Sequence, residues 1–208
     1  MKKIDELVIA TNNKNKLEEF RDIFSGSGIR VCSMADKGIH VDPDENGTTL
    51  NDNARIKARA VWEECHCPVV GDDTGLFVDA LGGEPGVFSA RYAGPDGNNG
   101  ANIDKLLEKL KGVPREERTA RFAVSLCYID AEGNEMIVHG RCEGWIAFER
   151  QGEGFGYEPV FCLNNGFSFA DIGKELKDRR SHRARAAHIL AFYLKGIKKV
   201  RGLSNGQQ

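Results

Sequence analysis

The sequence predicts an α/β fold, because its length, its composition and the order of its apolar patterns all fit that class. A chain of 208 residues can form one large α/β domain or two small lobes that share a cleft. Its 40% hydrophobic and 29% charged residues are ordinary for a soluble globular protein. Short apolar runs typical of buried strands alternate along the chain with amphipathic helical patterns.

The first half of the chain begins with a strand and contains two helical patterns. Leu17, Phe20 and Phe24 share one face of the first predicted helix. Leu50 opens the second, whose apolar stripe ends at Cys65. In order, the expected elements are a strand at 6–11, a polar turn at 12–15, the first helix, a strand at 29–34, an acidic loop at 42–49 and the second helix.

The second half predicts more strands and two further helices. A short strand at 68–71 is expected to end at Asp72 and Asp73, with extended chain at 76–81. After a glycine-rich stretch, the expected elements are a helix around 103–110, a hairpin of two long strands at 119–129 and 135–148, and a helix at about 181–200. The tail at 202–208 is expected to be disordered, and no linker is long enough to separate independent domains within 1–208.

Charge and cysteine usage exclude several classes of protein. A net charge of −2 creates no general attraction for nucleic acid, so a polyanionic substrate must be held by local groups or a metal. No apolar run approaches a membrane span, and the start MKKIDELVIA indicates a strand rather than a signal peptide. Six cysteines without zinc-site spacing indicate core thiols. We therefore expect a cytoplasmic protein without a membrane or nucleic-acid partner.

The segment TNNKNK at 11–16 is a candidate phosphate site. Thr11, Asn13 and Lys16 stand where a strand gives way to a helix, whose unpaired N–H groups and partial positive charge suit a phosphate chain. The Walker pattern GxxxxGK[ST] is absent. A capped helix with a solvated lysine explains the same residues. Further along, Asn53 and Lys57 are four residues apart and share a helix face.

Asp72-Asp73-Thr74-Gly75 is a candidate metal or catalytic segment. Adjacent carboxylates can hold a divalent cation or activate water, and Glu45 in the acidic loop could supply another oxygen ligand. Because neighbouring side chains of a strand point to opposite faces, we expect only one aspartate to reach the cleft. A pair of turn aspartates without catalytic function remains open at this point.

Two later segments contain candidate base-binding groups. GFGYEP at 154–159 places aromatic rings between glycines, which lets a flat ligand approach and stack, although core aromatics would give the same pattern. Ser181-His182-Arg183 opens the last predicted helix beside several basic residues, including Lys177. Basic groups oppose the dipole of a helix N-terminus, so the run indicates either a nearby anion or a solvated face.

Together these segments resemble the inosine triphosphate pyrophosphatase family, the Ham1-like enzymes that act on non-standard purine nucleoside triphosphates, over residues 7 to about 194. The matching pieces are TNNKNK, Glu45, NARIKA at 53–58, GDDTGLFVDALGGEPGVFSARYAG at 71–94, GFGYEPVF at 154–161, Lys177 and SHR at 181–183. The resemblance implies a long, curved mixed sheet with flanking helices, two lobes around a central active-site cleft, and a homodimer.

The resemblance also implies roles for individual residues. Asp73 is the general base, and Glu45 and Asp73 coordinate Mg²⁺. Thr74 stands where the family often has serine, and Glu158 where it usually has aspartate. The implied substrate-binding residues are Thr11, Asn12, Asn13, Lys14, Asn15, Lys16, Asn53, Lys57 and Thr74 for the triphosphate, and Phe155, Gly156, Tyr157, Glu158, Lys177, His182 and Arg183 for the purine.

The chemistry of the reaction agrees with this assignment. Hydrolysis at the α-phosphorus needs charge neutralisation and an oriented water, which lysines, Mg²⁺ and a carboxylate can supply. A 6-keto purine accepts at O6 and donates at N1–H, and adenine shows the reverse pattern, so a matching pocket would reject ATP. The predicted function is hydrolysis of ITP, dITP and XTP to the monophosphate and pyrophosphate.

Three alternatives remain open on the sequence alone. A Maf-like nucleotide pyrophosphatase of other base specificity is disfavoured by the SHR and GFGYEP segments. A non-catalytic nucleotide-binding regulator is disfavoured by the intact Asp73 and Glu45. A nucleic-acid repair factor is disfavoured by the net charge of −2 and the lack of a continuous basic stripe.

Overall fold

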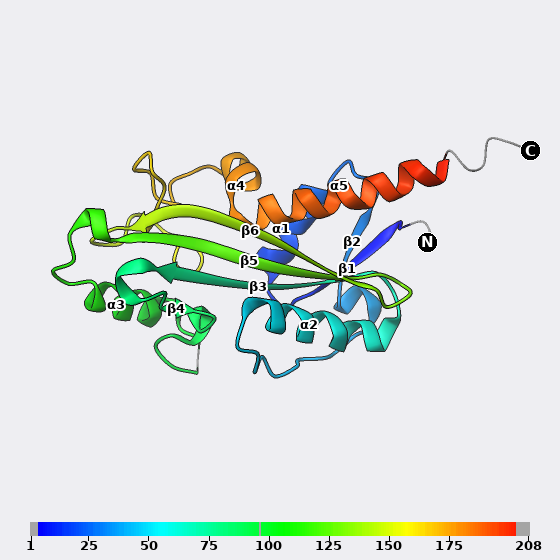
Figure 1. Cartoon of the computed structure of the whole chain (residues 1–208), viewed down its shortest axis with the longest axis horizontal. Coiled ribbons are helices and arrows are strands. Elements are labelled where there is room, and N and C mark those ends of the chain that lie inside the picture. Colours follow the sequence, from blue (N-terminus) through cyan, green and yellow to red (C-terminus); the bar gives the residue numbers. More distant parts are fainter. Residues whose placement is uncertain (1–3, 96, 203–208) are drawn as a thin grey trace, which may run out of the picture. The chain divides into compact units, whose positions relative to one another are not determined.

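The computed structural model describes residues 4–95 and 97–202, and its contacts divide the chain into two compact units (Figure 1). Unit 1 comprises Met1–Asp73, Ser125–Gly140 and Arg183–Gln208, and unit 2 comprises Thr74–Val124 and Arg141–His182. The predicted α/β class is confirmed. Of the tail predicted to be disordered, 203–208 lie outside the described residues.

The described chain forms a seven-stranded mixed sheet with strand order β2-β1-β3-β5-β6-β7, and β4 pairs with β3. β1 pairs in parallel with β2 and β3, whereas the β3–β4 and β6–β7 pairs are antiparallel. The strands are β1 Glu6–Ala10, β2 Arg30–Ser33, β3 Val69–Val78, β4 Pro85–Gly86, β5 Thr119–Ile129, β6 Glu135–Ile146 and β7 Phe161–Cys162. The α-helices are α1 Lys14–Phe24, α2 Leu50–Cys65, α3 Asn99–Lys109, α4 Lys174–Arg180 and α5 His182–Gly202.

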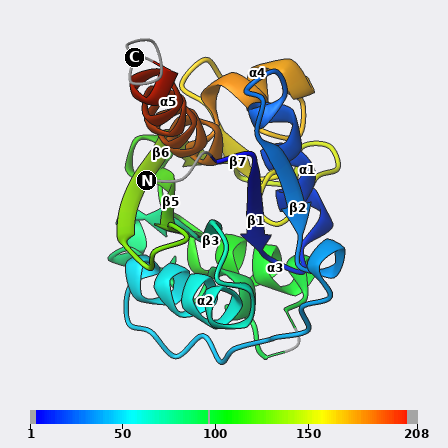
Figure 2. The same cartoon turned by 90° about the vertical axis from the view of Figure 1, so that its right-hand side faces the viewer.

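In unit 1, helices cover both faces of β1. Leu7 and Ile9 point to one face and Val8 to the other, yet all three are fully buried. α2 and α5 lie on opposite sides of this strand in both views, and α1 packs beside β2 (Figures 1 and 2). The strand is therefore apolar from Leu7 to Ala10, as expected of parallel sheets covered on both faces.

Local capping explains where the first two helices begin. The side chain of Asn13 accepts hydrogen bonds from the backbone N–H groups of Asn15 and Lys16, so α1 starts at Lys14. Thr49 and Asp52 form a reciprocal capping box that starts α2 at Leu50. The start of α2 agrees with the prediction, whereas α1 begins at Lys14, within the polar turn predicted at 12–15.

Unit 2 has a separate apolar core beneath its strands. α3 and α4 lie on opposite sides of its strands in both views (Figures 1 and 2). Its buried residues include Leu76 of β3, Leu106 of α3 and Phe161 of β7. Arg118 is also buried there, and its guanidinium donates to the carbonyls of Leu110, Ile146 and Ala147, which satisfies the charge without an acidic partner.

The structure corrects three sequence predictions. β3 runs without a break from Val69 to Val78, so Asp72 and Asp73 lie inside a strand rather than at its end in a turn. The chain at 79–81 is a 3₁₀ turn instead of extended, and β6 ends at Ile146 rather than at 148. α4 was not predicted, because its sequence KELKDRR offers one apolar side chain and therefore no stripe.

All six cysteines are free thiols, and four of them are buried, as predicted. Over the residues that the structure describes, no helix is long and apolar enough to cross a membrane.

Candidate active site

The loop between β1 and α1 is organised by its own side chains. Thr11 Oγ1 accepts from the Asn13 N–H at 3.1 Å, and Asn13 Oδ1 accepts from the N–H groups of Asn15 at 3.0 Å and Lys16 at 3.2 Å. These contacts fix the first turn of α1, the place where backbone N–H groups and the helix dipole favour an anion. Asn13 Oδ1 already accepts from two N–H groups of this turn, those of Asn15 and Lys16.

Asp72 is hydrogen-bonded to two cationic side chains in the interior of unit 1. Lys16 Nζ donates to its Oδ1, and Arg183 Nε donates to its Oδ2 at 2.7 Å. Arg183 also donates from Nη1 to Glu19 Oε2 at 2.8 Å. Although burial alone would raise the pKa of Asp72, the charges of Arg183 and Lys16 hold it far below its usual range. Asp72 is therefore a permanent buried anion whose oxygens are occupied.

Asp73, the next residue along β3, has an entirely different set of partners. Lys57 Nζ donates to Asp73 Oδ1 at 2.7 Å, and Asn53 Nδ2 lies 3.4 Å from Asp73 Oδ2. Burial raises the pKa of Asp73, and the neighbouring Glu45 carboxylate raises it further, against the opposing charge of Lys57. A carboxylate with a raised pKa is better suited to accept a proton from water than an ordinary aspartate is.

Glu45 lies close to Asp73 in unit 1, as the metal-site prediction requires. Lys57 Nζ donates to Glu45 Oε2 at 3.0 Å, and the same ammonium group donates to Asp73 Oδ1 at 2.7 Å. Burial tends to raise the pKa of Glu45, but the positive charge of Lys57 outweighs this and leaves the pKa lowered. The two carboxylates therefore share one ammonium group and, between them, one negative charge in excess.

This donor set fits a magnesium ion that takes most of its ligands from substrate and water. Mg²⁺ in nucleotide enzymes is held by one or two carboxylates together with phosphate oxygens. Glu45 and Asp73 converge closely enough to bind the same cationic nitrogen of Lys57. Over the described residues, no group of three or more His, Cys, Asp or Glu side chains could hold a metal by itself. The metal would thus depend on the phosphates to complete its shell.

Unit 2 contains the residues predicted to bind the purine. Phe155 is 46% exposed, which leaves its ring available for stacking, and Gly156 adopts a left-handed φ of 60° in the same turn. Tyr157 is buried and donates from its hydroxyl to the Ser89 carbonyl at 2.9 Å, so it supports the turn from below. Glu158 accepts from the Phe155 N–H and from Lys177.

His182 is buried and lies against an aromatic ring of the unit 2 core. It is 8% exposed, and its ring stacks on Phe122 of β5 with a centroid distance of 5.0 Å and an interplanar angle of 16°. Ser181 ends α4, where its N–H donates to the Lys177 carbonyl. Thr74 follows Asp73 in β3 and belongs to unit 2.

The structure thus groups the predicted residues in two sets. Those implied to hold the triphosphate and metal belong to unit 1 except Thr74, whereas the purine residues belong to unit 2 except Arg183. Within unit 1, Arg183 shares Asp72 with Lys16. Sequence reasoning missed Glu19, although its position three residues after Lys16 places both on one helix face.

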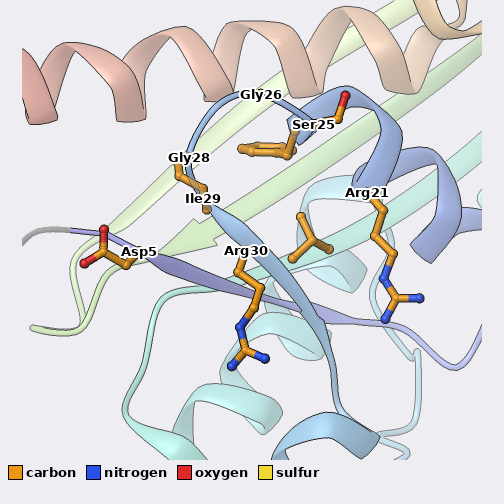
Figure 3. Close-up of a pocket in the computed structure, with 9 residues that line it drawn as sticks. Asp5, Arg21, Ser25, Gly26, Gly28, Ile29 and Arg30 are labelled. Carbon is orange, nitrogen blue, oxygen red and sulfur yellow. The ribbon is translucent and has the colours of Figure 1, made fainter.

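A cavity of about 430 Å³ opens elsewhere in unit 1, at the end of α1 and the start of β2 (Figure 3). It contains none of the predicted site residues. Two arginines at its rim are already paired, Arg21 with Asp36 and Arg30 with Glu6. The predicted site residues therefore lie outside this cavity.

Comparison with known proteins identifies the family of this chain. Residues 7–193 match the sequence model of the Ham1 family. A dITP/XTP pyrophosphatase of Geobacillus kaustophilus (strain HTA426) is 47% identical over 183 residues, which are 87% of this chain and 90% of the relative. A dITP/XTP pyrophosphatase of Bacillus subtilis (strain 168) is 43% identical over 192 residues, 91% of this chain and 96% of the relative.

Solved structures show the same similarity. The Ham1 protein of Staphylococcus aureus matches with a TM-score of 0.82 and 36% identity, covering 92% of this chain and 98% of that chain. A HAM1 protein of Coxiella burnetii matches with a TM-score of 0.83 and 33% identity over the same shares of the two chains.

Proposed function

This chain belongs to the Ham1 family, and from that membership we propose that it hydrolyses the non-standard purine nucleotides dITP, XTP and ITP to the monophosphate and pyrophosphate. Its relatives along nearly the whole chain are named dITP/XTP pyrophosphatases. The Maf-like alternative is not favoured by these matches. A purely regulatory role is also disfavoured, because the Asp73 environment is built for proton transfer.

The observation that carries the proposal is the contrast between the two adjacent aspartates of β3. Asp72 is neutralised by Lys16 and Arg183, while Asp73 retains a raised pKa beside Glu45 and Lys57. Oδ2 of Asp73, which Asn53 orients from 3.4 Å, would accept the proton of the attacking water. A water activated in this way attacks the α-phosphorus, and pyrophosphate leaves as the β- and γ-phosphates.

The cations of unit 1 would bind the triphosphate. Lys57 is mostly buried, and although burial opposes its charge, the Asp73 and Glu45 carboxylates raise its pKa, so it stays protonated. The first turn of α1 contributes N–H groups and a partial positive charge near Lys16. When bound, Mg²⁺ would neutralise phosphate charge, with Glu45 and Asp73 as its protein ligands.

A product assay tests the proposal directly. Purified protein is incubated with ITP, dITP, XTP, GTP, ATP or UTP, with Mg²⁺ or with EDTA, and products are separated by anion-exchange chromatography. We expect IMP and pyrophosphate from ITP, weak turnover of ATP and UTP, and no reaction in EDTA. Release of IDP and orthophosphate as the primary products would overturn the assignment of the cleaved bond.

Two further properties belong to the proposal. We propose a homodimer in the cytoplasm, on the family resemblance and on the thiol state of the cysteines. The exposed faces of Ile189 and Phe192 on α5, at 56% and 81%, offer apolar surface that a partner subunit could cover. Sedimentation velocity on the full chain would show a single species of twice the monomer mass.

A further inference from the structure

Glu158 stands in the predicted purine site, but its contacts in unit 2 are to the protein. Its Oε2 accepts from the backbone N–H of Phe155 at 3.1 Å and from Lys177 Nζ at 2.9 Å. Its own N–H donates to the Phe155 carbonyl at 3.2 Å. The side chain therefore folds back over the turn that carries Phe155 and ties that turn to α4.

Gly154 makes room for this arrangement. A Cβ added at Gly154 would lie 2.8 Å from Glu158 Oε2 and 2.9 Å from Glu158 Cβ, distances too short for real contacts. The glycine before Phe155 is therefore required by the Glu158 side chain packed over it. Gly156, by contrast, has open space around its Cβ position and is needed for its positive φ.

The neighbouring backbone fixes where Glu158 starts. Pro159 restricts the residue before it, and the Pro159 carbonyl accepts from the Gln151 N–H at 2.6 Å. Glu158 is 23% exposed in its side chain and Lys177 is 28% exposed, so the ion pair is partly shielded from water. A carboxylate shared by a backbone N–H and an ammonium holds both donors in place.

From these contacts we infer that Glu158 is a positioning residue that locks the Phe155 turn onto Lys177, and not an acceptor for the purine N1–H. This inference rests on the proposed function, because Phe155 is taken to stack on the purine. The length of the side chain matters: aspartate is shorter by about one C–C bond, roughly 1.5 Å, and could not reach both donors from the same backbone. Glutamate at this position is thus matched to Gly154 and Lys177.

The lock would act on substrate binding more than on the chemical step. An ordered Phe155 ring can stack on any purine. Loosening its turn should therefore weaken the binding of all purine nucleotides by a similar factor. We expect Glu158→Ala to raise KM roughly tenfold with kcat changed less than about threefold. Gly154→Ala, which displaces the same carboxylate from the other side, should reproduce the effect.

The decisive experiment compares ITP with 1-methylinosine triphosphate, which lacks the N1–H. If Glu158 positions Phe155, then Glu158→Ala, Glu158→Asp and Gly154→Ala raise KM for both nucleotides by the same factor. If Glu158 accepts from N1–H, the loss falls on ITP and largely spares the methylated analogue, and this outcome would overturn the inference. Glu153→Ala, an exposed glutamate of the same segment, is the matched control.

A second measurement separates this inference from the proposed function. Hydrogen–deuterium exchange of the peptide spanning 151–160 reports the Phe155 N–H contact without any turnover. We expect faster exchange in Glu158→Ala and in Lys177→Ala, and no change in Glu153→Ala. In the double variant Glu158→Ala with Lys177→Ala, the effect on exchange should be smaller than the sum of the two single effects. Unchanged exchange in Glu158→Ala would refute the lock even in an active enzyme. Absence of pyrophosphatase activity in the wild-type protein would instead refute the proposed function.

Discussion

Replacing each aspartate of β3 in turn by asparagine should separate folding from catalysis. Asp72 and Asp73 are adjacent and both buried, at 1% and 7% exposure, so composition alone gives no reason to expect different outcomes. Their partners differ completely, because alternate positions of a strand face opposite sides. We expect Asp72→Asn to lower stability strongly and Asp73→Asn to lower kcat strongly.

The structure gives the size of each effect. Asp72→Asn leaves Lys16 and Arg183 with an uncompensated buried positive charge, and breaking such a pair costs about 3–5 kcal/mol. Glu19 still accepts from Arg183, so we expect the lower end of that range. In Asp73→Asn, Lys57 keeps its ion pair with Glu45, and the loss of stability should stay near about 1 kcal/mol. Removal of the general base should lower kcat by about 10²–10⁴-fold.

Urea denaturation and steady-state kinetics on the two variants supply the comparison. The free energy of unfolding comes from the denaturation midpoint and slope, and kcat is measured with ITP at a temperature where both variants are folded. The reverse pattern, with a stable but inactive Asp72→Asn and an unstable but active Asp73→Asn, would refute the division of roles. The sequence alone predicts that only one of the two aspartates reaches the cleft, and the ion pairs of Asp72 add the expectation about stability.

Four other predictions follow from contacts within unit 1. Arg183 is bonded to Asp72 and Glu19 in unit 1. We therefore expect Arg183→Ala to lower kcat/KM for ITP and for ATP by similar factors. A loss confined to ITP would instead identify Arg183 as a purine ligand. Burial raises the pKa of Asp73 above its ordinary 3.8, and only the ionised carboxylate can accept a proton. We therefore expect kcat/KM to fall as the pH falls through the raised pKa. A pH profile that is the same in Asp73→Asn as in the wild type would contradict this expectation. The pKa of Asp72 is lowered, so its ionised form stabilises the folded protein. This contribution to stability is complete above pH 3.8, the ordinary pKa, and is lost as the pH falls below it. Acid denaturation followed by circular dichroism can check this prediction. Gly71→Ala should destabilise by about 1–3 kcal/mol in urea titrations, because its Cβ would lie 2.1 Å from the Ala54 carbonyl oxygen of α2.

Features encoded by neighbouring residues could be predicted from the sequence. The starts of α1 and α2 depend on Asn13 and Thr49, each of which bonds to residues two or three positions later. The long hairpin of β5 and β6 also follows from local patterns on either side of a turn. In these places, short-range hydrogen bonds and hydrophobic periodicity agree with the final fold.

Features that depend on distant partners could not be predicted in the same way. The continuity of β3 through two carboxylates requires cations that lie 56 residues before and 111 residues after Asp72. Without knowledge of Lys16 and Arg183, two adjacent aspartates are more typical of a turn than of a buried strand. The residues of the candidate site came from the family resemblance, and their contacts came only from the structure.

The placement of charges in unit 1 explains how one strand can hold two aspartates with opposite tasks. Arg183 and Lys16 both donate to Asp72 and lower its pKa, whereas the ammonium group that donates to Asp73 is that of Lys57, which also donates to Glu45. A carboxylate paired with two cations is too weak a base to accept a proton. A buried carboxylate that shares one cation with a second carboxylate is a stronger base than usual. The alternation of the strand keeps these two environments on opposite faces, although the residues are covalently adjacent. If Asp73 is the general base, as we propose, adding a cation beside Lys57 should lower the pKa of Asp73 and weaken it as a base.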